Sequence, residues 1–95
     1  MAYPQISGQK TISAAGTAEA LGTVQIDAAL LVRALDTNVG IVALGNDGAN
    51  DVTVSNGYRL SAGEALIFDH VDNLASIYLD SAINGEGVSW LKLDA

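Results

Sequence analysis

Hydrophobic residues in this sequence form short runs, separated roughly every eight to twelve residues by glycine, asparagine or aspartate. The runs are rich in Val, Ile, Leu and Thr, and several alternate apolar with polar positions, which is typical of strands in an antiparallel sandwich or barrel. The pattern predicts an all-β fold, a small antiparallel β-sandwich of jelly-roll character with about eight short strands. The expected strands cover residues 9–13, 18–21, 29–35, 41–44, 52–54, 58–60, 65–69, 76–80 and 88–93.

Alternation within the runs also predicts which side chains share a face of the sheet. In the run 29–35, Leu30, Val32 and Ala34 share one face and the odd-numbered residues share the other. The turn around Asn56 and Gly57 separates two of the expected strands, because both residue types tolerate positive φ. Residues 1–8 are expected to form an N-terminal arm, or else a frayed terminus, and 9–95 a single β-sandwich domain.

Aromatic residues are few, one Trp, one Phe and three Tyr. We expect Trp90, Phe68 and either Tyr58 or Tyr78 to form the centre of the core. The alternative is that some of them form a platform for a ligand.

The charge balance excludes several classes of function. Eleven acidic residues and four basic ones give a formal charge of −7, which argues against a nucleic-acid binder and against adhesion to anionic membranes. No apolar run approaches the about 20 residues that cross a bilayer, and the N-terminus lacks the pattern of a secretory signal. We therefore expect no nucleic-acid or membrane partner, and a chain made in a cytoplasm and kept there or released by lysis.

Charged residues make up 16% of the chain, below the roughly 25% usual for soluble domains. Much of the surface must then consist of small neutral residues. Either the protein is a monomer with such an exterior, or one face is buried against a partner or other copies of the chain. We favour the second interpretation.

Catalytic and metal chemistry find little support in the sequence. The chain has no cysteine and one histidine, His70, which we interpret as a solvated turn residue because nothing identifies a nucleophile beside it. The loop 46–51, from Asn46 to Asp51, offers oxygen ligands for calcium but lacks the spacing of known calcium loops, and plain turn chemistry explains it. We expect no enzyme activity, no catalytic residue, no metal site and no cofactor.

Two features remain as candidates for a partner interface. Arg33 lies in the strongest strand and is either an outward-facing side chain or a salt link to a neighbouring subunit. Tyr3, Pro4 and Ile6 lie in the expected arm, where they are able to pack against another protein.

Five segments, in this order, carry a resemblance to a known group of proteins. They are Leu-Val-Arg-Ala (31–34), Asn-Val-Gly-Ile-Val (38–42), Gly-Tyr-Arg-Leu-Ser-Ala-Gly-Glu (57–64), Asn-Leu-Ala-Ser-Ile-Tyr-Leu-Asp (73–80) and Gly-Val-Ser-Trp (87–90). The pattern resembles the small β-sandwich virion structural proteins of tailed bacteriophages, some of which are capsid decoration, or cement, proteins. Residues 60–64 are also similar to jelly-roll folds of the cupin type, although one histidine cannot supply the cupin metal ligands.

The resemblance implies a non-catalytic function. The protein would bind the major capsid protein on the outer surface of the head and stabilise the shell, as a homo-oligomer that we expect to be a trimer. Its location would be the capsid surface of the virion, after synthesis in the host bacterial cytoplasm. The alternatives are a carbohydrate- or receptor-binding module on a virion appendage, a tail or head-to-tail connector component, and, least favoured, a hydrolase that uses His70.

Overall fold

Eight short strands make up the fold in the computed structural model, which describes residues 6–45 and 52–93. One turn of 3₁₀ helix, η1 (Leu74–Ser76), accompanies them. The all-β class predicted from the sequence is confirmed. The strands are β1 (Ser7–Thr11), β2 (Glu19–Ala20), β3 (Gln25–Ala34), β4 (Val42–Gly45), β5 (Tyr58–Leu60), β6 (Ala65–Asn73), β7 (Tyr78–Ser81) and β8 (Gly87–Lys92).

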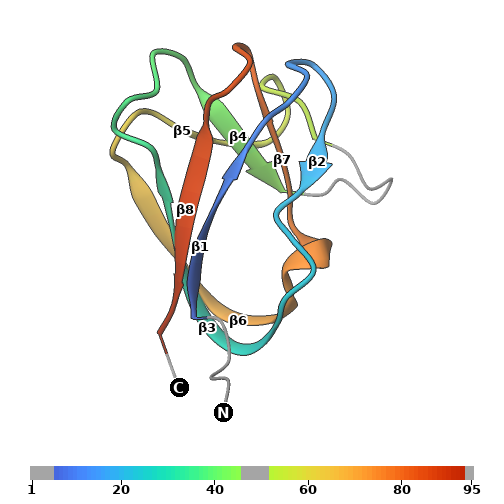
Figure 1. Cartoon of the computed structure of the whole chain (residues 1–95), viewed down its shortest axis with the longest axis vertical. Helices are drawn as coiled ribbons and strands as arrows, with labels where there is room; N and C mark the ends of the chain where they lie inside the picture. The colour runs from blue at the N-terminus through green and yellow to red at the C-terminus, as the bar shows by residue number, and fades with distance from the viewer. Residues whose placement is uncertain (1–5, 46–51, 94–95) are drawn as a thin grey trace.

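The strands form two antiparallel four-stranded sheets, with the orders β1-β8-β3-β6 and β2-β7-β4-β5 (Figure 1). Four pairings join strands counted from opposite ends of the chain: β1 with β8, β2 with β7, β3 with β6 and β4 with β5. This is the pattern of one long hairpin, wound up so that β3 also pairs with β8 and β4 with β7. Such a wound hairpin is a jelly roll, so the jelly-roll character is confirmed.

The hydrophobic core lies between the two sheets. Leu30, Val32 and Ala34 of β3, which the alternation placed on one face, are completely buried. Leu44 from β4 and Leu79 from β7 belong to the same buried cluster. The inward face of each sheet therefore carries apolar side chains.

The aromatic residues contribute less to this core than expected. Trp90 is buried with 5% of its surface exposed, and Phe68 is half-buried against the core cluster. Tyr58 is 64% exposed and Tyr78 is half-buried, and neither belongs to the core cluster. The expectation that one tyrosine would help to form the core centre is wrong, because Leu, Ile and Val side chains fill that space.

Residues 52–54 were predicted as a strand, and this prediction is wrong. The backbone N–H of Thr53 donates to Oδ1 of Asn56 at 2.8 Å, and the Thr53 carbonyl accepts from the N–H groups of Asn56 and Gly57. Thr53 has thus used its backbone groups in the turn and cannot pair with a neighbouring strand. The turn at Asn56 and Gly57 is confirmed, although it precedes β5 without closing a two-stranded hairpin.

The first sheet begins inside the segment that was expected to be an arm. Ser7 pairs with Leu91 and Gly8 with Trp90, and the carbonyl of Ile6 accepts from the N–H of Lys92 at 2.7 Å. The last two residues of that segment are therefore part of β1. Residues 1–5 lie outside the described residues.

Two polar side chains, one buried and one exposed, hold the β1–β2 connection in place. Asp80 in β7 is 2% exposed, and its Oδ1 accepts from the N–H of Gly16 at 2.9 Å. Oδ1 of Asn84 accepts from the N–H of Ala15 at 2.7 Å. The connection between β1 and β2 is thereby held against the connection between β7 and β8.

Candidate functional site

Three large aliphatic side chains form a row across the outer face of the first sheet. Leu31 in β3 is the cross-strand partner of both Ile67 in β6 and Leu91 in β8. Ile67 is 60% exposed and Leu91 is 40% exposed, while Leu31 between them is half-buried. We call Leu31, Ile67 and Leu91 the apolar row. It spans three adjacent strands and leaves hydrophobic surface in contact with water, which is a feature of interaction sites.

Arg33 lies directly beside the apolar row. It is two residues beyond Leu31 on the same face of β3 and pairs with Ala65 and Ser89 on the neighbouring strands. Its side chain is exposed, in agreement with the interpretation of an outward-facing residue. Its Nε donates to the carbonyl of Gly63 at 3.2 Å. A salt link to another subunit stays a prediction.

Ile6 and Arg33, the two described members of the predicted interface, are not neighbours. Ile6 is 46% exposed and adjoins Lys92 through its carbonyl, at the register level of Leu30. Strand β8 lies between Ile6 and strand β3, and Arg33 lies three positions beyond Leu30 on β3. The other two members, Tyr3 and Pro4, lie outside the described residues. The structure thus does not bring Ile6 and Arg33 together into one patch.

Two irregularities in the pairing of β3 and β6 create a second candidate site. Between Ala28↔Val71 and Leu30↔Phe68, β6 contains one extra residue, and between Gln25↔Asn73 and Ala28↔Val71 the extra residue is in β3. Such bulges redirect side chains. Phe68 and Val71 both pack inward although three positions separate them.

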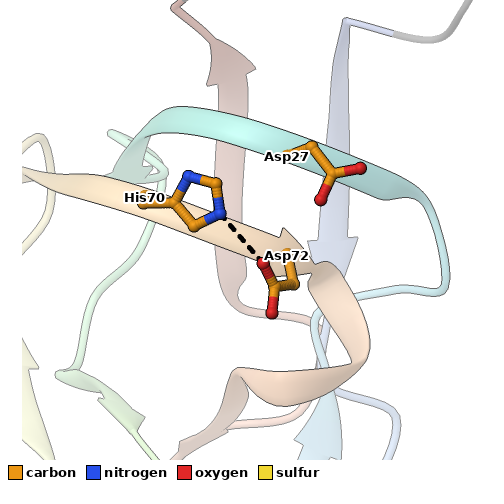
Figure 2. Close-up of side chains that lie close together, drawn as sticks. All are labelled: Asp27, His70 and Asp72. Carbon is orange, nitrogen blue, oxygen red and sulfur yellow. Dashed lines mark hydrogen bonds and ion pairs between the residues drawn. The ribbon is translucent and has the colours of Figure 1, made fainter.

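The inward turn of Val71 places its two neighbours, His70 and Asp72, on the exposed surface together. Asp27 projects from β3 beside them (Figure 2). Its backbone has a φ of +50°, a left-handed conformation that aspartate tolerates better than most residues. Nε2 of His70 lies 2.9 Å from Oδ1 of Asp72, and one ligand atom from each of the three residues lies within 4.8 Å of the others. We call Asp27, His70 and Asp72 the Asp–His–Asp cluster.

His70 therefore differs from its predicted setting. It is exposed, as expected, but it lies inside strand β6 and not in a turn. Its imidazole lies against Asp72, and no serine or threonine is hydrogen-bonded to it among the described residues. Residues 6–45 and 52–93 also form no pocket.

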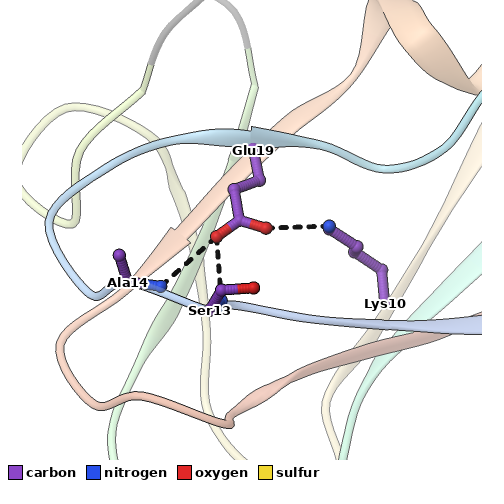
Figure 3. A network of polar contacts seen from close by, with 4 residues as sticks. All are labelled: Lys10, Ser13, Ala14 and Glu19. Atoms are coloured by element: carbon purple, nitrogen blue, oxygen red, sulfur yellow. Dashed lines mark hydrogen bonds and ion pairs between the residues drawn. The ribbon is translucent and has the colours of Figure 1, made fainter.

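A third polar group, around Glu19, has a structural role (Figure 3). Oε1 of Glu19 lies 2.8 Å from Nζ of Lys10, and Oε2 accepts from the N–H groups of Ser13 at 2.8 Å and Ala14 at 3.4 Å. The hydrogen bond from Lys10, aided by the two backbone donors, lowers the pKa of the Glu19 carboxyl. These contacts tie the connection between β1 and β2 to the end of β1.

Sequence reasoning missed both the apolar row and the Asp–His–Asp cluster. The apolar row forms because of the register in which β3 pairs with β6 and β8, and neighbouring residues in the sequence do not reveal that register. The cluster had one local signal, the polar–apolar–polar order of His70, Val71 and Asp72, which is out of phase with the inward-facing Leu66 and Phe68. The loop 46–51, considered for calcium, lies outside the described residues.

Comparison with models of protein families, with curated proteins and with solved structures gives no match for this chain. Within the described residues, no helix has the length and hydropathy needed to span a bilayer.

Proposed function

We propose that this protein is a non-catalytic structural protein of a bacteriophage virion, a decoration protein that binds the outer surface of the head and stabilises it. The observation that carries the proposal is the apolar row of Leu31, Ile67 and Leu91, exposed on a regular sheet face. The sequence resemblance supplies the partner, the major capsid protein. An exposed sheet face on which the described residues form no pocket suits contact with another protein better than capture of a small molecule.

Energetic considerations support a lattice partner. Burial of an aliphatic side chain stabilises a contact by about 1.5–3 kcal/mol when the side chain goes from full exposure to full burial. Ile67 and Leu91 are already partly covered, so one docked copy gains only part of this amount. Many copies on a repeating shell raise the effective affinity, because each assembly engages several sites at once.

Arg33 adds a positive charge to the proposed contact. It is exposed beside the apolar row, and the chain carries eleven acidic residues against four basic ones. A second copy therefore offers many carboxylates with which this guanidinium can pair. We propose that three copies assemble in this way on the shell.

The carbohydrate-binding alternative receives less support. Sugar platforms depend on exposed aromatic rings. Among the described residues, Tyr58 is the one aromatic residue with more than half of its surface exposed. The outer face of the first sheet carries aliphatic residues instead. Aliphatic side chains contribute to protein contacts without the ring geometry that a sugar requires.

The proposal is tested with empty shells assembled from the major capsid protein of the phage whose virion contains the chain, as the proposal requires. Wild-type protein is expected to sediment with the shells and to saturate. Ile67→Lys should abolish cosedimentation, because it places a charge in the contact. Val39→Lys is the matched control: Val39 is 87% exposed and lies between β3 and β4, away from the row. Equal binding by both variants, or no binding by the wild type, would overturn the proposal.

Two further measurements define the assembly. Light scattering of the purified chain is expected to give three times 9.7 kDa, either free or when eluted from shells. Deletion of residues 1–5 tests the contact expected for Tyr3 and Pro4 and spares Ser7 and Gly8, which pair with β8. Undiminished shell occupancy by the shortened chain would remove the arm from the interface.

A further inference from the structure

The strongest unexplained feature of the surface is the Asp–His–Asp cluster at one end of the β3–β6 pair. We propose that Asp27, His70 and Asp72 form a binding site for a divalent transition-metal ion of the zinc type. This inference does not depend on the proposed function.

The donor set selects the class of ion. One imidazole nitrogen and two carboxylate oxygens are ligands of zinc and its neighbours, which bind histidine and carboxylates together. Calcium and magnesium prefer a shell of oxygen atoms, and the imidazole contributes nothing to such a shell. The histidine therefore distinguishes this cluster from an ordinary group of acidic surface residues.

The distances fit a metal with small adjustments of the side chains. Zinc bonds of about 2.0–2.2 Å place neighbouring tetrahedral ligands roughly 3.4 Å apart. Nε2 of His70 and Oδ1 of Asp72 are 2.9 Å apart, and all three ligand atoms lie within 4.8 Å of one another. Rotation of exposed side chains covers the difference, so the backbone need not move.

The backbone that carries the ligands is held by strand pairing. His70 and Asp72 lie two positions apart on β6, and Asp27 lies on the hydrogen-bonded neighbour β3 (Figure 2). Val71, between the two β6 ligands, is 6% exposed and packs in the core, which fixes the direction of both side chains. A site on paired strands keeps its geometry better than a site on a loop.

Local charge also favours a cation. No ion pair within the described residues joins a lysine or arginine to Asp27 or Asp72, and the Asp27 carboxylate accepts no hydrogen bond from the described residues. Lys10 is already paired with Glu19. Within the described residues the two carboxylates therefore lack a lysine or arginine partner, and a bound ion would supply a positive charge beside them. Three protein ligands would leave the fourth coordination position of the bound ion open to a water molecule.

The single histidine of the chain makes the site directly observable. Zinc chloride is titrated into the chelator-treated full chain while the imidazole proton signals are followed by NMR and the heat by calorimetry. The wild type is expected to show saturable shifts of the His70 signals at one ion per chain. Calcium chloride at the same concentrations is expected to leave these signals in place.

Variants assign the ligands. Asp27→Asn and Asp72→Asn should each raise the zinc Kd at least about tenfold. Removal of a residue that only hydrogen-bonds a metal ligand already lowers metal affinity about 10–100-fold, and these two residues are proposed as ligands themselves. Asparagine also tolerates the left-handed backbone at position 27. Asp69→Asn is the matched control, because it removes one charge next to His70 without removing a cluster ligand. Its Kd should stay within about twofold of the wild type.

Three results would overturn the inference. They are no saturable shift of the His70 signals, an equal shift with calcium, and an equal loss of affinity in Asp69→Asn and Asp27→Asn, which would indicate diffuse attraction by acidic groups. Backbone amide spectra of each variant confirm that it is folded. Ile67→Lys should bind zinc like the wild type while losing shell association, so the two proposals fail independently.

Discussion

The side-chain amide of Asn38 pairs with the backbone of Gly87, 49 residues away, through two hydrogen bonds. Nδ2 of Asn38 donates to the Gly87 carbonyl at 2.9 Å, and the Gly87 N–H donates to Oδ1 of Asn38 at 3.2 Å. The carboxylate of the adjacent Glu86 accepts from the N–H groups of Val39 and Gly40. Together these bonds dock the β3–β4 connection onto the start of β8.

Gly87→Ala should destabilise the protein by about 3 kcal/mol, a large overpacking effect. A Cβ at this position would lie 1.9 Å from the carbonyl oxygen of Lys10 and 2.7 Å from Cα of Thr11, so β1 would have to move away from β8. Gly16→Ala is the control: nothing lies within 4 Å of its added Cβ, and only its φ of +91° costs energy, about 1 kcal/mol. Urea unfolding compares the two, and an equal loss of stability would contradict the steric argument.

Asn38→Ala should cost about 2 kcal/mol, because Asn38 is 8% exposed and its removal leaves the buried Gly87 N–H without its partner. The Gly87 carbonyl keeps the bond that it accepts from the N–H of Leu35. Amide hydrogen exchange should therefore accelerate at Gly87 more than at Leu35. Unchanged protection of the Gly87 amide would show that the side-chain bond is not needed.

Val71→Asn should cost about 3 kcal/mol, since it buries an amide without a partner in the core. His70→Asn, one position away, should change stability by less than about 0.5 kcal/mol because His70 is exposed. Thermal unfolding of both variants tests the bulge in β6. If alternation continued unbroken from Phe68, His70 would face inward and the two effects would be reversed.

The Glu19 carboxyl should make stability depend on pH in the acidic range. Its pKa is lower in the folded protein than in the unfolded chain, so its contribution is fully present above the unfolded value of about 4.3 and is lost as the pH falls through the folded pKa. Solvent screens this pair, which limits the contribution to about 0.5–1 kcal/mol. The stability difference between wild type and Glu19→Gln should shrink from pH 7 to pH 3; a constant difference would contradict this assignment.

Local sequence alone determined the class of the fold and much of its inner face. Alternation placed Leu30, Val32 and Ala34 on one face because side chains on a strand alternate in direction, whatever the strand pairs with. Asn56 and Gly57 determined a turn because both accept the backbone angles that a turn requires. These features depend on neighbouring residues only.

Tertiary structure decided the rest, because it depends on contacts between distant segments. Residues 52–54 have strand-like composition, yet Thr53 uses its backbone groups within the turn. Asp80 lies on the opposite face of β7 from the core residue Leu79, yet it is buried, and its carboxylate accepts from the N–H of Gly16.

The two candidate sites depended on tertiary structure most of all. Asp27 meets His70 and Asp72 only because β3 pairs with β6 and two opposite bulges shift the register between them. The apolar row exists only because β8 and β6 flank β3. The sequence specifies which residues favour strands and turns, but strand order and register follow from the lowest free energy of the whole wound hairpin.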